Sequence, residues 1–231
     1  MNRKQIFLLL LACLLTPMLA ACTPEREQSY SAKPVIYLYP EDESCADETT
    51  DAKPVLYLTP ERGLDVTVQL DYAGTLTCTY PAYDDGWHVH AAPDGTLTDT
   101  AGQTYRYLYW EGVTDAEYDL SSGFCVRGSD TAAFLEQALA ELGLTRAEAN
   151  EFIIYWLPQM QENDWNLIAF QSDAYTEAAR LIITPEPDTL IRVFMAWKPL
   201  AAPVELPAQT LTAPERRGFT AVEWGGSRLS R

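Results

Sequence analysis

The chain's two histidines lie close together in the sequence. His88 and His90 flank Val89, so on a β-strand both imidazoles would point to the same face. Two neutral imidazoles at this spacing can bind one metal ion, but a catalytic zinc site needs a third protein ligand, and no sequence spacing supplies one. We therefore treat His88 and His90 as weak metal candidates, with a solvated sheet face as the alternative. No cofactor is expected.

A carboxylate follows a segment that is dense in aromatic residues. Glu111 comes directly after Trp110, and a carboxyl group beside apolar rings can have a raised pKa and act as a general acid. Glycoside hydrolysis needs a second carboxylate at roughly 5 to 9.5 Å, and the sequence does not locate one. The aromatic residues have two interpretations: a platform that stacks on sugars, or a buried core, which we favour. The candidate ligand-binding residues are Trp87, Tyr107, Tyr109, Trp110 and Glu111.

Nucleophilic chemistry has little support in the sequence. No GxSxG, HExxH or glycine-rich phosphate loop occurs, which favours a protein without catalysis. Cys78 and Cys125 lie in strand-like segments, so they form either a disulfide or two separate buried thiols. Cys45 lies in an acidic loop and is expected to be unpaired.

The N-terminal residues predict a secretory signal that ends at a cysteine. Arg3 and Lys4 precede a short apolar run, and Leu19-Ala20-Ala21 leads into Cys22. A membrane-spanning helix needs roughly 20 apolar residues, and this run is shorter. The string LAAC resembles the lipobox of bacterial lipoprotein precursors, which implies cleavage after residue 21 and a diacylglyceryl group on Cys22. Residues 1–21 are then the signal peptide and residues 22–32 a flexible tether.

The charge balance excludes one class of partner. Without Arg3 and Lys4 the chain keeps 14 basic and 33 acidic residues, a formal charge of −19. Phosphate backbones are bound by clustered Lys and Arg, and no such cluster occurs, so nucleic acid is not expected. An anionic membrane surface would repel the same charge, so lipid on Cys22 is needed to hold the protein at a bilayer.

The region 33–127 predicts an antiparallel, β-rich, sandwich-like structure. Alternating residues in 65–72 and 75–80, around Ala73-Gly74, predict a β-hairpin. Further strands are expected at 87–91 and 104–110. In the second of these, Tyr105, Tyr107 and Tyr109 would share one face.

A repeated segment precedes the hairpin. KPVIYLYPE begins at Lys33 and KPVLYLTPE begins at Lys53. Each copy reads as a strand that ends at a proline, Pro40 or Pro60. The two copies are either neighbouring strands or duplicates that compete for one position in a sheet.

The region 128–231 predicts an α+β structure, either separate from region 33–127 or integrated with it in one domain. Helical spacing after Asp130, and a capping box that starts at Thr145, predict an αα-hairpin whose second helix ends or kinks at Pro158. A small second sheet is expected from a hairpin of 181–184 and 189–197. The remaining predicted elements are a strand at 166–171, a short helix at 174–180 and a last strand at 219–224.

Five segments also occur, in this order, in a family of uncharacterised secreted or lipid-anchored proteins. The chain resembles that family over about residues 33 to 225, and the resemblance implies no activity, cofactor or catalytic residue. The second copy at Lys53 departs from the single motif of the family. The segments are KPVIYLYP (33–40), LTCTYPAY (76–83), YLYWEG (107–112), YWLP (155–158) and PDTLIRVFM (187–195).

The sequence as a whole predicts an acidic α+β lipoprotein outside the cytoplasm, anchored to the bacterial cell membrane. Its expected role is binding or scaffolding in the cell envelope, with a cell-wall glycan or an envelope protein as partner. The alternative is a carboxylate-based hydrolase, with or without a metal, that acts on envelope glycans or peptides.

Overall fold

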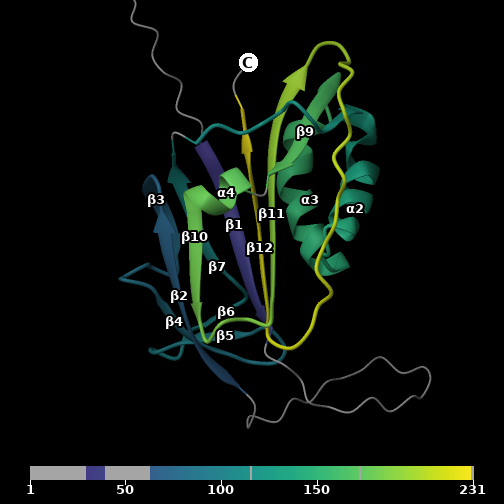
Figure 1. Ribbon diagram of the computed structural model, residues 1–231. Helices are drawn as coiled ribbons and strands as arrows, with labels where there is room; N and C mark the ends of the chain where they lie inside the picture. The colour runs from purple at the N-terminus through teal and green to yellow at the C-terminus, as the bar shows by residue number, and fades with distance from the viewer. Residues whose placement is uncertain (1–29, 40–62, 115, 172, 230–231) are drawn as a thin grey trace, which may run out of the picture.

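Two β-sheets and a pair of helices form three layers (Figure 1). The computed structural model describes residues 30–39, 63–114, 116–171 and 173–229. A seven-stranded sheet has the order β3-β7-β1-β12-β11-β9-β8, and a five-stranded sheet has the order β10-β2-β4-β5-β6. Among the described strands, every pair is antiparallel except β11 with β12, which is parallel. The predicted α+β class with mainly antiparallel strands is confirmed.

The elements follow one another with β-strands predominating in the first half. The strands up to the helices are β1 (Tyr30–Tyr39), β2 (Leu64–Tyr72), β3 (Thr75–Tyr80), β4 (Trp87–Ala91), β5 (Leu97–Asp99), β6 (Thr104–Tyr105), β7 (Leu108–Val113) and β8 (Phe124–Arg127). The rest are η2 (Gly128–Asp130), α2 (Thr131–Glu141), α3 (Arg146–Met160), β9 (Trp165–Gln171), α4 (Asp173–Ala178), β10 (Ala179–Thr184), β11 (Thr189–Leu200) and β12 (Thr220–Arg228).

An inter-sheet core lies between the two sheets. Strand alternation produces it: in β4 the odd-numbered Trp87, Val89 and Ala91 are buried, whereas His88 and His90 are exposed. The seven-stranded sheet contributes large side chains such as Trp110 and Phe194 to the same core. One face of the five-stranded sheet is therefore buried and the other is open to solvent.

A second core joins the helices to the opposite face of the seven-stranded sheet. Phe152 and Trp156 of α3 pack against Trp197 and Trp224 of the central strands. The predicted capping box at Thr145 is present and starts α3. Pro158 does not end that helix, which continues to Met160.

The chain passes from one sheet to the other where hairpins were predicted. β2 does not pair with β3, because the two strands lie in different sheets. The backbone of Ala73 instead bonds to other elements: its N–H donates to Ala178 O at 2.7 Å, and its carbonyl accepts from Thr114 Oγ1 at 2.8 Å. The hairpin prediction was wrong because the alternating pattern identifies a strand's buried face but not its neighbour.

Two other predictions fail for the same reason. The strand predicted at 104–110 is divided, since β6 belongs to the five-stranded sheet and β7 to the seven-stranded sheet. Tyr105 therefore packs on the inter-sheet core and Tyr107 on the helical core, so the tyrosines do not share one face. β10 and β11 are also in different sheets, joined by residues 185–188.

The expected separate small sheet in 128–231 does not form. β10 pairs with β2 and β12 pairs with β1, so strands from this region enter both sheets. The physical reason is burial. The apolar side chains of both regions pack into shared cores, so the strands of region 128–231 pair with strands of region 33–127. Residues 1–29, which include the predicted signal peptide and most of the predicted tether, lie outside the described residues, as do Cys45 and the second repeat copy. Residues 30–32, predicted as the end of the tether, belong instead to β1, because they pair with β7 and β12. Within the described part of the chain, no helix has the length and apolar character needed to cross a membrane.

A long irregular segment connects the two parallel strands β11 and β12. We call residues 201–219 the strap; it passes beside the helices on its way from β11 to β12 (Figure 1, yellow). Parallel neighbours need such a crossover, because the chain must return to the same end of the sheet. The Gln209 side chain accepts from Phe170 N at 2.8 Å and donates to Phe170 O at 2.9 Å, and so attaches the strap to β9.

Candidate functional site

The open face of the five-stranded sheet carries a polar hollow. Its side chains come from adjacent strands in register, with Asp65 opposite His90, Thr67 opposite His88, and His90 opposite Thr98. The hollow has a volume of about 400 Å³. It is lined by Asp65, Val66, Thr67, His88, Val89, His90, Thr98, Asp99 and Thr100.

Both histidines in the hollow are held by neighbours on β2. His90 Nδ1 lies 2.7 Å from Asp65 Oδ1, and His88 Nδ1 lies 3.1 Å from Thr67 Oγ1. A ring whose Nδ1 donates a proton presents Nε2 as an acceptor. Among the residues that the structure describes, no group of three or more Cys, His, Asp or Glu side chains could hold a metal ion.

Asp99 forms one end of the hollow. Its carboxylate accepts from the backbone N–H groups of Ala101 and Gln103 and from the Tyr105 hydroxyl at 3.0 Å. The Gln103 N–H is the main cause that lowers the pKa of Asp99, so this group stays ionised. The Tyr105 ring meets Tyr80 edge-on at 5.6 Å, and Tyr80 is 63% exposed. Asp99 is opposite Val89 in the strand register and Tyr105 packs on the inter-sheet core, so this aromatic pair lies on the side of the sheet that faces away from the two histidines.

The structure does not bring the predicted aromatic platform together. Trp87 and Trp110 are buried in the inter-sheet core, where their indole N–H groups donate to Pro81 O and Glu223 Oε1. Tyr107 and Tyr109 are half-buried, and neither lines the hollow. Burial and then a hydrogen bond to Glu111 raise the pKa of Tyr109. Of the four predicted aromatic residues, the two tryptophans are therefore core residues and the two tyrosines are half-buried outside the hollow.

Glu111 and the two described cysteines do not assemble a reactive centre. Glu111 is half-buried on β7 and does not line the hollow. Cys78 and Cys125 are free thiols on β3 and β8, the two edge strands of the seven-stranded sheet. The disulfide expected as one alternative is therefore not formed, because five other strands lie between the two cysteines.

A buried polar cluster in the inter-sheet core was not anticipated from the sequence. Arg192 Nε donates to Glu223 Oε2 at 2.6 Å, and the Glu223 side chain is fully buried. The Arg192 guanidinium lies 4.7 Å from the Tyr175 ring centre. Burial acts to lower the pKa of Arg192, but the Glu223 charge and Tyr175 outweigh it and raise that pKa. The available signal was one charged residue within each of two otherwise apolar runs, 190–197 and 219–224.

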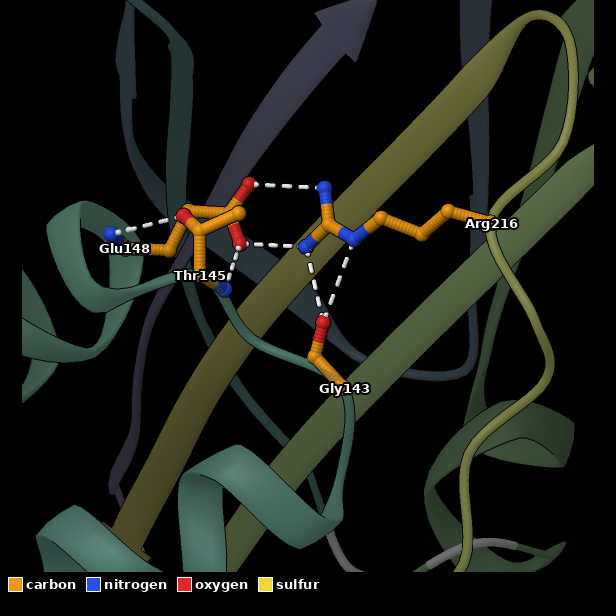
Figure 2. A network of polar contacts seen from close by, with 4 residues as sticks. All are labelled: Gly143, Thr145, Glu148 and Arg216. Carbon is orange, nitrogen blue, oxygen red and sulfur yellow. Dashed lines mark hydrogen bonds and ion pairs between the residues drawn. The ribbon is translucent and has the colours of Figure 1, made fainter. Parts of the chain in front are cut away.

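A second buried carboxylate fastens the strap to the helices (Figure 2). Glu148 is fully buried at the start of α3 and accepts from Thr145 N at 2.7 Å and from the Arg216 guanidinium. Arg216 also donates to Gly143 O at 2.8 Å. Every group in this cluster has a structural partner, so we assign it to stability and not to ligand binding.

Comparison with known proteins places the chain in a family. No family model matches the chain, and no solved structure matches it significantly. The "Uncharacterized protein in bglA 3'region" of Butyrivibrio fibrisolvens is 32% identical over 115 residues, which covers 99% of that protein and 48% of this chain. The chain belongs to the same family as this protein. This bglA 3′-region family brings no stated activity, so the roles of its residues rest on the geometry above.

Proposed function

We propose that the protein is a lipid-anchored lipoprotein of the bacterial cell envelope whose folded body binds a ligand without catalysis. The observation that carries the anchor is the LAAC string before Cys22, behind a charged start and a short apolar run. The tether would place the β-rich body outside the cytoplasm. More than one acyl chain makes such an anchor stable, where a single chain is marginal.

The polar hollow is the proposed binding surface. Its hydroxyl, imidazole and carboxylate groups project from one sheet face and can bond a ligand that is rich in hydroxyl groups. The inter-sheet core holds the opposite face of the same strands, so the two sheets act as a sandwich-like, rigid platform. With a formal charge of −19 after processing, polyanions are disfavoured, and we propose a neutral cell-wall glycan as ligand.

The donors and acceptors of the hollow support a glycan as ligand. The hydroxyls of Thr67 and Thr98 can both donate and accept, as the hydroxyl groups of a sugar do. The hydrolase alternative gains no such support in the described residues, because Glu111 lies away from the hollow.

The anchor is tested by fractionation of cells that express the full chain. The unchanged protein should be recovered with membranes, and Cys22→Ala should be released as soluble material. A Cys22→Ala protein that stayed with membranes would show that lipid on this cysteine is not the anchor.

The binding surface is tested by calorimetry with chitooligosaccharides and soluble peptidoglycan fragments. Losing one hydrogen bond in His88→Ala or Thr98→Ala should weaken binding about 2- to 10-fold. Thr184→Ala is the matched control, since Thr184 is exposed on β10 but does not line the hollow. Absence of binding across the panel, or equal losses in all three variants, would argue against this site.

A further inference from the structure

The position of β1 in the seven-stranded sheet can hold one strand only. β1 pairs antiparallel with β7 on one side and with β12 on the other. Ile36 is opposite Leu108 of β7 and Glu223 of β12, so both edges of the strand are used. A second strand of the same sequence could enter this position only by replacing the first.

The chain contains a second segment that fits the same position. Residues 32–41 (AKPVIYLYPE) and 52–61 (AKPVLYLTPE) are identical at eight of ten positions. One difference is Ile36 against Leu56, two apolar side chains of the same volume. The other is Tyr39 against Thr59, at the last residue of the strand, opposite Thr220.

We propose that the two copies are alternative occupants of the β1 position, with Val55–Thr59 able to replace Val35–Tyr39. Connection length supports the exchange. β1 ends at Tyr39 and β2 begins at Leu64, which leaves 24 connecting residues, whereas from Thr59 only four would remain. Connections in compact domains have a median of about 4–6 residues, and irregular ones longer than about 15 are uncommon.

The fold already contains a link of that length at the same end of the molecule. Residues 185–188 carry the chain from β10 in one sheet to β11 in the other. Thr184 before this link is opposite Thr67 of β2, and Thr189 after it is opposite Thr220, the residue opposite Tyr39. The end of β1 and the first half of β2 are therefore separated by a distance that the four residues 185–188 already span between β11 and β10.

The exchange would change the distance between body and membrane, a consequence that rests on the proposed lipid anchor. When the second copy occupies the sheet, 20 further residues join the segment between Cys22 and the body. These residues can extend the tether by at most about 72 Å. The duplication would thus let one protein operate at two heights above the bilayer.

Proline substitution tests whether either copy suffices. A proline inside a central strand removes a ladder hydrogen bond and prevents its use. In chains that begin at residue 22 with Cys22→Ala, Ile36→Pro and Leu56→Pro should each keep a cooperative thermal transition, and the double variant should lose it. Val222→Pro in the neighbouring β12, which has no duplicate, should lose it alone. A single proline variant that unfolds like the double variant would overturn the proposal, as would a double variant that stays folded.

Disulfide trapping shows directly which of the two copies occupies the β1 position. Leu38 is opposite Ala221, and Leu58 is its counterpart in the second copy. Leu38→Cys or Leu58→Cys would be combined with Ala221→Cys, in the Cys22→Ala chain with Cys45, Cys78 and Cys125 changed to serine. Both pairs should form a bridge on mild oxidation, and a bridge from one copy only would overturn the proposal. Neither test uses a membrane, so their outcome is independent of whether the lipid anchor is correct.

Discussion

At the scale of single residues, the Arg192–Glu223 ion pair is a buried polar contact within the inter-sheet core. Both side chains are buried, 2.6 Å apart, between layers of aromatic residues. Removing two charges from water costs several kcal/mol each, and the attraction between them offsets that cost only while both are present. The pair is therefore expected to matter more through the penalty of breaking it than through its net contribution.

This asymmetry makes a prediction for paired variants. Glu223→Ala leaves the Arg192 cation buried without its partner and should lower the free energy of unfolding by about 3–5 kcal/mol. The double variant Arg192→Met with Glu223→Leu removes both charges and should lose clearly less. Urea denaturation of the three proteins measures this. A double variant at least as unstable as Glu223→Ala would contradict the argument.

Asp99 provides a pH-dependent prediction at the same scale. Its pKa is lower in the folded chain than the ordinary value of 3.8, mainly because the Gln103 N–H donates to the carboxylate. Its stabilising contribution is therefore present above pH 3.8 and is lost as the pH falls through the folded-state pKa. Compared with Asp99→Asn, the unchanged protein should have the higher urea midpoint at pH 7, and the difference should shrink towards pH 2.5. A constant difference would assign the effect to packing instead.

At the scale of elements, Arg216 is the basic residue that fastens the strap to the helices. Arg216→Ala leaves the Glu148 carboxylate with its capping bond but without its counter-ion, and should cost about 2–3 kcal/mol, since Arg216 is partly exposed. The matched control is Arg217→Ala, whose partner Glu215 is exposed, and a surface pair contributes about 0–1 kcal/mol. Thermal unfolding compares the two variants, and equal losses would show that the buried Arg216–Glu148 pair contributes no more than a surface pair.

The sequence predicted elements well and their neighbours poorly. The strand at Trp87–Ala91 and the capping box at Thr145 agree with the structure, because alternation and capping are local properties. The β2–β3 hairpin failed because Ala73 bonds to Ala178 and Thr114, which are distant in the sequence. Strand pairing depends on packing and hydrogen bonds between residues that are distant in the sequence, and the local patterns of a single sequence do not indicate those contacts.

The candidate site shows the same division between local and distant information. Alternation correctly put His88 and His90 on the solvent-facing side of a strand. Their partners Asp65 and Thr67, and Asp99 at the end of the hollow, depend on the register of three strands. The aromatic candidates near Glu111 share a segment of sequence, but β6 and β7 divide that segment between two sheets.

At the scale of the whole molecule, charge and the proposed lipid would have opposite effects on membrane attachment. The processed chain would carry a formal charge of −19, and an anionic leaflet attracts basic residues by about 1 kcal/mol each while it repels acidic ones. Attraction would require a basic cluster, and the sequence has none. Any stable attachment to anionic lipid must therefore come from acyl chains.

Vesicle sedimentation tests this balance with purified protein. The unlipidated Cys22→Ala chain should not sediment with phosphatidylglycerol vesicles at 10 mM salt, where charge acts over about 30 Å, or at 150 mM, where it acts over about 8 Å. The lipidated chain should sediment at both concentrations, and added salt should not release it, because the lipid contribution is apolar. Binding of the unlipidated chain at low salt, with release at high salt, would reveal a basic surface and contradict the proposed mode of attachment.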